Sequence, residues 1–268
     1  MLLAIDVGNT QTVIGLYGLD DGAEQRGTGA ERDLLDHWRI ATSAERTSDE
    51  LALLVQEFLG FHGFNFDEDV DGVALCSSVP SITAAVREMC ERYFGFHAIV
   101  VEPGVKTGMP ILYDNPRQVG PDRIADALAA YDLYGGPTIV VDFGTATTFD
   151  AVSARGEYLG GAICPGITIS MEALFKNASK LPRVEFVKPP HIIGKNTVHS
   201  IQSGLMFGYV GLVDGICDRM SRELGGATVI ATGGLAPLVA QESKAIAQVD
   251  EFLTLDGLRI IHARNGGA

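Results

Sequence analysis

The chain has few of the residues that mark disulfide-rich or zinc-binding proteins. Its 268 residues include four cysteines, and no two of them form a C-x-x-C pair. Cysteines scattered in this way are typical of free thiols in a reducing compartment, and not of a disulfide framework or a zinc site. The six histidines show no H-x-x-x-H or similar ligand spacing, so we interpret them as structural residues.

Long apolar runs and excess positive charge are also absent. The apolar runs are only as long as a strand, so we expect no transmembrane helix. Met1 leads directly into such a run, so we expect no signal peptide and a cytoplasmic protein. The 20 Lys and Arg residues face 34 Asp and Glu residues, which gives a net charge of −14. This charge disfavours nonspecific binding of nucleic acid or membrane, and an anionic substrate would need a local basic patch.

One short motif occurs twice, about half the chain length apart. Residues 5–10 read IDVGNT and residues 141–146 read VDFGTA, each at the end of an apolar run. The glycine lets backbone N–H groups approach an anion, and the aspartate can hold a cation or its water shell. No G-x-x-x-x-G-K-[ST] loop is present, so a nucleotide would have to be bound by such turns and by metal ions.

A single Asp-x-Gly after a strand is usually only a turn. Two copies at half-chain spacing favour a duplicated fold whose halves face each other across a cleft, where the turns could clamp a metal–nucleotide phosphate chain. In this respect the chain resembles the superfamily of acetate kinase, sugar kinases, Hsp70 and actin.

The apolar periodicity predicts two similar α/β halves. We predict strands at 2–5, 12–17, 37–41, 73–76, 98–101, 138–141, 147–152, 158–163 and 228–231. We predict helices after a capping box at Thr47 and Glu50, and at 80–93, 121–134, 167–175, 198–223 and 255–263. Three strands followed by alternating helix and strand is the order of an RNase H-like fold, here duplicated with an interdomain cleft.

The periodicity breaks at residues 114–116, where Asp, Asn and Pro follow one another. We therefore predict an N-terminal half at 1–117 and a C-terminal half at 118–268, each with one copy of the motif. Residues 19–33 are rich in Gly, Asp and Glu, and we expect a surface hairpin or loop there.

Gly120, Pro121, Asp122 and Arg123 open a predicted helix. Pro121 suits the first helical position, and the helix dipole favours an ionised Asp122 in the first turn. Asp122 could be a simple capping carboxylate. It could also accept the proton of an attacking hydroxyl, with Arg123 holding an anionic substrate.

Together the motifs resemble type III pantothenate kinase, in that family's order and over nearly the whole chain. The stretches that carry the resemblance are DVGNT at 6–10, EPGVKTG at 102–108, GPDR at 120–123, DFGTATT at 142–148, GGAICPG at 160–166 and NT at 196–197.

This resemblance implies ATP-dependent phosphorylation of the primary hydroxyl of pantothenate to 4′-phosphopantothenate, the first step of coenzyme A synthesis. It implies that Asp122 is the general base, that Asp142 binds a monovalent cation (K⁺ or NH₄⁺), and that Asp6 lies near Mg²⁺. The residues it assigns to ATP are Asp6, Val7, Gly8, Asn9, Thr10, Gln11, Thr12, Val13 and Thr145. Those it assigns to the pantothenate pocket are Tyr113, Gly120, Pro121, Asp122, Arg123 and Thr197. It also implies a homodimer whose partner subunit helps to close that pocket.

Some features have two interpretations at this stage. Gly233 and Gly234 could approach adenine or form a plain turn. Asp126 could assist the site or lie on a solvated helix face, and Lys106 could neutralise substrate charge or be a surface lysine. Three glycines on one predicted helix face favour close helix packing, as at a dimer interface: Gly204, Gly208 and Gly211.

Two other functions compete with the pantothenate kinase hypothesis. One is a kinase or phosphatase of the same superfamily that acts on a sugar or acetate, against which the stretch 120–123 and Thr197 are the discriminating residues. The other is a non-catalytic regulator, since some relatives are described as accessory factors for transcription. The presence of Asp122 and Asp142, the acidic charge and the lack of a visible helix-turn-helix weigh against it.

Overall fold

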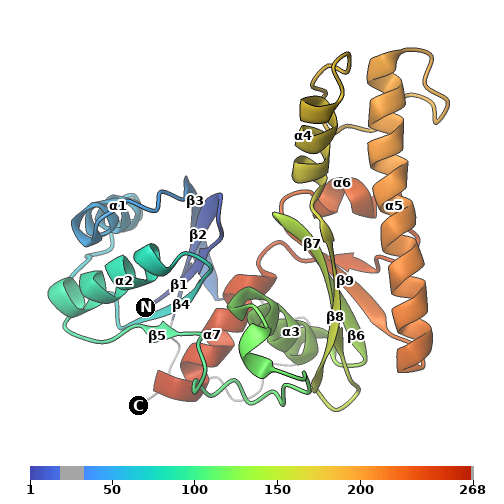
Figure 1. Ribbon diagram of the computed structural model, residues 1–268. Coiled ribbons are helices and arrows are strands. Elements are labelled where there is room, and N and C mark those ends of the chain that lie inside the picture. Colours follow the sequence, from blue (N-terminus) through green and yellow to red (C-terminus); the bar gives the residue numbers. More distant parts are fainter. Residues whose placement is uncertain (19–32, 267–268) are drawn as a thin grey trace. The chain divides into compact units, whose positions relative to one another are not determined.

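The computed structural model describes residues 1–18 and 33–266. Their contacts divide the chain into two compact units, each with its own five-stranded sheet (Figure 1). Unit 1 comprises Met1–Met109, Asp114–Leu133 and Leu253–Ala268, and unit 2 comprises Pro110–Tyr113 and Tyr134–Phe252. Among the described residues, no helix is both long enough and apolar enough to cross a membrane.

The sheet of unit 1 has the strand order β3-β2-β1-β4-β5. Its strands are β1 (Leu2–Val7), β2 (Gln11–Tyr17), β3 (Leu34–Ala41), β4 (Gly72–Ser77) and β5 (Ile99–Val100). The first three strands pair antiparallel, whereas β4 pairs parallel with β1 and β5 parallel with β4. The predicted hairpin around the first motif and the third strand are therefore confirmed.

Helices of unit 1 bury the central strands. They are α1 (Ser48–Gly60), α2 (Pro80–Met89, continued by a π-helical turn at Cys90–Phe94), α3 (Pro121–Tyr134) and α7 (Leu253–Gly266), with a 3₁₀ turn at Pro116–Gln118. The capping box at the start of α1 is present, because Thr47 and Glu50 each accept from the other's backbone N–H. Alternate residues of β1 pack with α1 and α2 in one apolar core, and α7 packs against β1 and β4.

Helices α3 and α7 cross closely in unit 1. A Cβ built on Gly257 would lie 2.1 Å from the carbonyl oxygen of Ala125, so only glycine permits this approach. Thr254 Oγ1 also donates to Asp126 Oδ1 at 2.7 Å. The contacts thus group most of α3 with α7, and α7 packs against the first sheet, whereas the boundary between residues 117 and 118 stays a prediction.

The sheet of unit 2 repeats the topology of the first. Its strands are β6 (Thr138–Phe143), β7 (Ala146–Val152), β8 (Tyr158–Pro165), β9 (Thr228–Thr232) and β10 (Gln248–Val249), in the order β10-β9-β6-β7-β8. Read from the other edge, this order matches that of unit 1 strand for strand. The pairing directions match as well, because β6 is antiparallel to β7 and parallel to β9.

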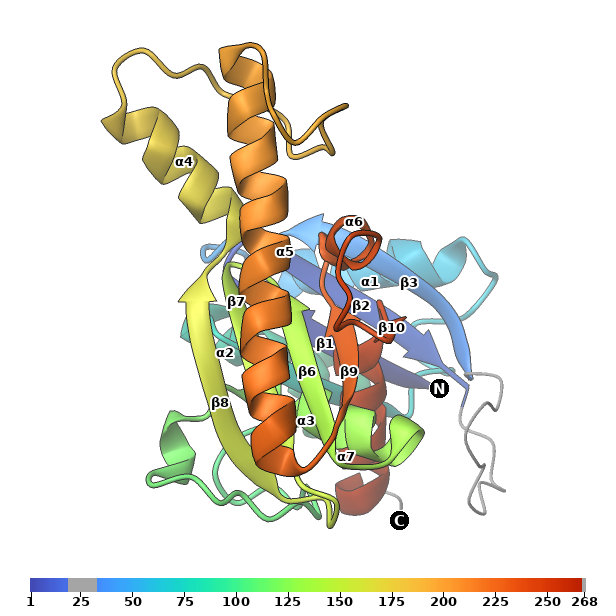
Figure 2. The ribbon, with the colours of Figure 1, turned by 90° about the vertical axis from the view of Figure 1, so that its right-hand side faces the viewer.

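Three helices belong to unit 2: α4 (Ile167–Asn177), α5 (Thr197–Leu224) and α6 (Ala236–Ala240). Helices α5 and α6 share an apolar core with β6, β7 and β9. Figure 2 shows α5 running along the sheet of this unit and, with α4, beyond its edge. The predicted helices are confirmed; α6 and β10 are too short to produce a periodic signal in the sequence. The predicted loop at 19–33 lies outside the described residues except for Asp33.

Candidate active site

Asp6 lies near the end of β1, between two neighbouring strands. Its register partners are Val13 on β2 and Cys76 on β4. The thiol of Cys76 donates to Oδ1 of Asp6, with 3.1 Å between Sγ and Oδ1. Burial raises the pKa of Asp6 to about 6, the hydrogen bond from Cys76 opposes this rise, and the negative charge of Asp122 adds to it. The fold thus brings the two carboxylates into electrostatic contact.

Asp122 stands in the first turn of α3, one residue after Pro121 at the helix start. Its Oδ1 accepts the backbone N–H of Arg123 at 2.9 Å. A Cβ built on Gly120 would lie only 2.4 Å from that oxygen, so a larger residue there would displace the carboxylate. The side chain of Arg123 is buried, with 8% of the residue exposed. The stretch 120–123 therefore combines a half-buried carboxylate with a buried arginine.

The turn between β1 and β2 is held from outside by Thr42. Thr42 Oγ1 donates to the carbonyl of Gly8 at 2.8 Å, and its backbone N–H donates to the carbonyl of Thr10 at 3.0 Å. Thr42 Oγ1 also lies 2.9 Å from Thr12 Oγ1. Asn9 and Thr10 remain exposed at the tip. Nothing in the sequence marked Thr42, because it follows the third strand and lies more than 30 positions from the turn.

Asp142 holds the same position on β6 that Asp6 holds on β1, with register partners Thr148 and Thr232. Glycines flank both carboxylate oxygens: a Cβ on Gly144 would lie 3.1 Å from Oδ2, and one on Gly233 would lie 2.6 Å from Oδ1. Gly233 has φ of +89°. Of its two interpretations, a turn that makes room for Asp142 is the one that this geometry favours.

The turn between β6 and β7 also brings backbone carbonyl oxygens close to a glycine. A Cβ on Gly166 would lie 2.2 Å from the carbonyl oxygen of Thr145 and 2.7 Å from that of Gly144. Thr145 is exposed at the tip of the turn. Carboxylate and carbonyl oxygens are the donors that hard cations prefer, so the donor types at Asp142 and Asp6 fit the cations that the motifs imply.

Among residues 1–18 and 33–266, no three His, Cys, Asp or Glu side chains form a metal-ligand cluster. Magnesium in nucleotide-binding sites is typically held by one or two carboxylates together with water and phosphate oxygens.

Two predicted pantothenate residues lie in unit 2. The ring of Tyr113 packs on Gly160, where a Cβ would meet ring carbons at 3.2 Å, and beside Tyr158 with 6.3 Å between ring centroids. Tyr158 in turn donates to Oδ1 of the fully buried Asp150 at 2.7 Å. No local pattern predicts the burial of Asp150, because a carboxylate within a strand resembles any solvent-facing residue of an alternating pattern.

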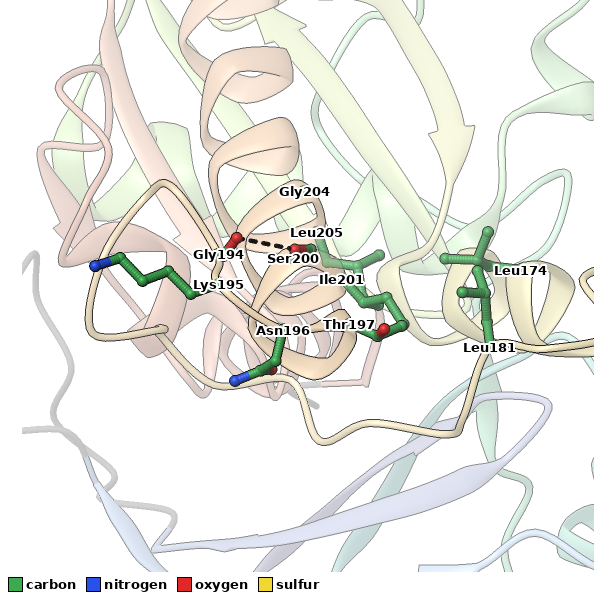
Figure 3. A pocket seen from close by; sticks show the side chains of 10 residues that line it. All are labelled: Leu174, Leu181, Gly194, Lys195, Asn196, Thr197, Ser200, Ile201, Gly204 and Leu205. Atoms are coloured by element: carbon green, nitrogen blue, oxygen red, sulfur yellow. Dashed lines mark hydrogen bonds between the residues drawn. The ribbon is translucent and has the colours of Figure 1, made fainter.

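Thr197 begins α5, directly after the N-cap Asn196, whose side chain accepts the N–H of His199. An open hollow of about 600 Å³ lies at this helix end, and Thr197, Leu174 and Leu181 are among its lining residues (Figure 3).

The predicted residues therefore fall into two sets. Unit 1 holds Asp6, the turn at 8–13 and the stretch 120–123, and unit 2 holds Tyr113, Asp142, Thr145 and Thr197. The solvated-face interpretation of Asp126 is wrong, because only 2% of that residue is exposed.

A family model described as type III pantothenate kinase matches residues 2–219. The chain belongs to the type III pantothenate kinase family. Curated relatives named type III pantothenate kinase include one from Myxococcus xanthus, 61% identical over 99% of both chains. Another, from an Anaeromyxobacter species, is 59% identical over 99% of this chain and 100% of its own. One from Streptomyces avermitilis is 54% identical over 99% of this chain and 98% of its own.

Solved structures support the fold class. A Campylobacter jejuni protein described as a Baf family transcriptional activator has a TM-score of 0.59 at 19% identity, with 99% of this chain and 100% of that chain covered. An archaeal actin homologue has a TM-score of 0.50 at 13% identity, with 98% and 99% covered. These likenesses concern the fold alone. With the repeated sheet topology, they confirm the predicted duplicated fold of the actin and sugar kinase superfamily.

Proposed function

We propose that the chain transfers the γ-phosphoryl group of ATP to the primary hydroxyl of pantothenate and so forms 4′-phosphopantothenate for coenzyme A synthesis. This proposal rests on the sequence identity of 54–61%, over 99% of this chain, to proteins named type III pantothenate kinase. Membership in this family makes the protein a kinase, and its substrates are accordingly ATP and pantothenate.

Asp122 is the general base in this proposal. Phosphoryl transfer needs an in-line hydroxyl whose proton leaves as the new P–O bond forms, and a carboxylate in hydrogen-bond reach accepts that proton. Gly120 leaves space for this carboxylate, and the dipole of α3 favours its ionised form. Arg123 binds the pantothenate carboxylate, with Tyr113 and Thr197 as further pocket residues.

The turn at residues 6–13 and Thr145 bind ATP. Backbone N–H groups of a glycine-containing turn can hold phosphate oxygens, and the hydrogen bonds of Thr42 keep the first turn in one conformation. When bound beside Asp6, Mg²⁺ would neutralise charge on the transferring phosphoryl group. Asp6 and Asp122 repel each other, and a cation near Asp6 would relieve that repulsion.

Asp142 binds a monovalent cation, K⁺ or NH₄⁺. A carboxylate at the end of a strand beside a phosphate site needs a counter-cation to avoid repulsion. Its two oxygens are flanked by glycines, which leave room beside them.

The protein forms a homodimer through α5. The three glycines on this helix, Gly204, Gly208 and Gly211, are exposed, and a Cβ added to any of them would meet no atom within 4 Å. Exposed apolar side chains also lie on α4, in the segment before α5 and at the start of α5: Ile169, Leu174, Phe175, Ile192, Ile193 and Val198. An apolar surface of this kind favours a protein partner, and a second copy would complete the pocket at Thr197.

We place the enzyme in the cytoplasm. All four cysteines are free, as is usual for proteins in a reducing compartment.

The test is an assay of ADP formation from ATP with and without pantothenate, first in potassium and then in sodium buffer. We expect ADP only when pantothenate is present, and more of it in potassium. Turnover with a sugar or acetate but not pantothenate would favour the rival kinase hypothesis. No turnover with any of these substrates would favour a regulator.

A further inference from the structure

Cys76 lies directly beside Asp6. Strands β1 and β4 run parallel with Asp6 and Cys76 in register, and the thiol donates to Oδ1 of Asp6 at 3.1 Å. No part of Cys76 is exposed. This contact joins residues that are 70 positions apart in the chain.

The side chain of Cys76 is on a different face of the sheet from the apolar core that α1 and α2 share. Its neighbours on β4, Val73 and Leu75, belong to the core that α1 and α2 cover, but Cys76 does not. Cys90, the other buried cysteine of unit 1, does belong to that core. Cys76 is buried on the other face, where its thiol meets Asp6.

The thiol of Cys76 is the donor in its contact with Asp6, because an ionised carboxylate can only accept a hydrogen bond. The two residues are in register on paired strands, so the backbone holds the S–H group beside one oxygen of Asp6.

We propose that Cys76 is a positioning residue for the nucleotide: its thiol holds Oδ1 of Asp6 and so orients Oδ2 toward magnesium and phosphate. This inference rests on the role of Asp6 given under Proposed function. The terminal torsion angle of an aspartate side chain, χ2, has a broad distribution. A hydrogen-bond donor on one carboxylate oxygen restricts this angle and so restricts the positions that the other oxygen can take.

The experiment compares Cys76→Val with Cys76→Ser. Valine is similar in size to cysteine and has no donor, whereas serine keeps a donor and is more polar. We expect Cys76→Val to weaken the binding of magnesium–AMP-PNP in calorimetry, and to raise the KM for ATP, by about fivefold. The KM for pantothenate should stay unchanged. We expect Cys76→Ser to remain within about twofold of the wild type.

Cys90→Val and Cys90→Ser are the matched controls, with melting temperatures measured for all four variants. We expect both Cys90 variants to bind nucleotide like the wild type. If Cys76→Val unfolds, Cys76→Ala removes the donor without adding a methyl group, and the same loss of nucleotide affinity is expected.

Two outcomes would overturn the inference, and Asp6→Asn separates them. If Asp6→Asn loses nucleotide affinity but Cys76→Val or Cys76→Ala keeps it, Cys76 only fills space and the role of Asp6 stands. If Asp6→Asn keeps wild-type affinity, the role of Asp6 is itself wrong, and the inference about Cys76 fails with it.

Discussion

Asp6 and Asp142 occupy equivalent positions in two sheets that share one strand order. Each lies on the central strand, one residue before its end, between an antiparallel and a parallel neighbour. Their surroundings differ: a thiol donates to Asp6, whereas glycines flank Asp142. This difference is consistent with the two roles proposed above for one duplicated position, one toward nucleotide–magnesium and one toward a monovalent cation.

Asp122→Asn should lower kcat about a hundredfold or more, because an amide cannot accept the proton of the attacking hydroxyl. The fold should survive, since asparagine is acceptable at a helix start. Steady-state kinetics and circular dichroism would check this. Asp132→Asn, on the same helix and paired with Arg264, is the control that should keep its activity. A folded Asp122→Asn protein with near-normal kcat would show that Asp122 is not the base.

Asp142→Ala should lose both activity and its stimulation by potassium, because the cation would lose its carboxylate ligand. ADP formation would be measured in potassium, ammonium and sodium chloride at equal ionic strength. Asp218→Ala, which removes an exposed carboxylate paired with Arg222 in the same unit, should leave the potassium response intact. Equal wild-type rates in sodium and potassium would rule out the assignment of this site.

Arg123→Ala should raise the KM for pantothenate about tenfold or more and change the KM for ATP little. A charge-assisted hydrogen bond to a carboxylate is worth roughly 1.5–3 kcal/mol. Arg123→Lys, which keeps the charge, should fall between wild type and alanine. The exposed Arg117→Ala is the control for a general loss of positive charge. Loss of ATP affinity alone would place Arg123 on the nucleotide.

Gly208→Lys should convert the proposed dimer into a monomer, because a long charged side chain would stand where two helices approach. Light scattering after size-exclusion chromatography would give the mass. Gly60→Lys, also at an exposed helical glycine with open space around it, should stay dimeric. The fold should tolerate both changes, since lysine favours helix more than glycine does. A fully active wild-type monomer at micromolar concentration would contradict the dimer.

Stability should fall as the pH drops below about 6.5, in part through His262. Burial lowers the pKa of His262, and the positive N-terminus lowers it further. The unfolded chain therefore binds a proton at a higher pH than the folded one, and acid favours unfolding. His262→Gln should show a smaller drop in melting temperature between pH 8 and pH 5.5. The exposed His97→Gln should behave like the wild type, and an equal drop in all three proteins would exclude this role of His262.

Local features of this protein were determined by the sequence itself. The strand of Asp6, the capping box of Thr47 and the helix that starts at Pro121 are encoded in consecutive residues, so periodicity and short motifs suffice to predict them. The repeated motif also indicated the duplication of the fold, because both copies end the central strand of equivalent sheets.

Only the tertiary structure decided which distant residues meet. The register of β1 and β4 places Cys76 on Asp6, and the end of β3 places Thr42 on the turn at Gly8. The close crossing at Gly257 groups α3 and α7 with the first sheet. These contacts depend on strand register and helix packing between segments far apart in the chain, so they cannot be predicted from a local pattern of residues.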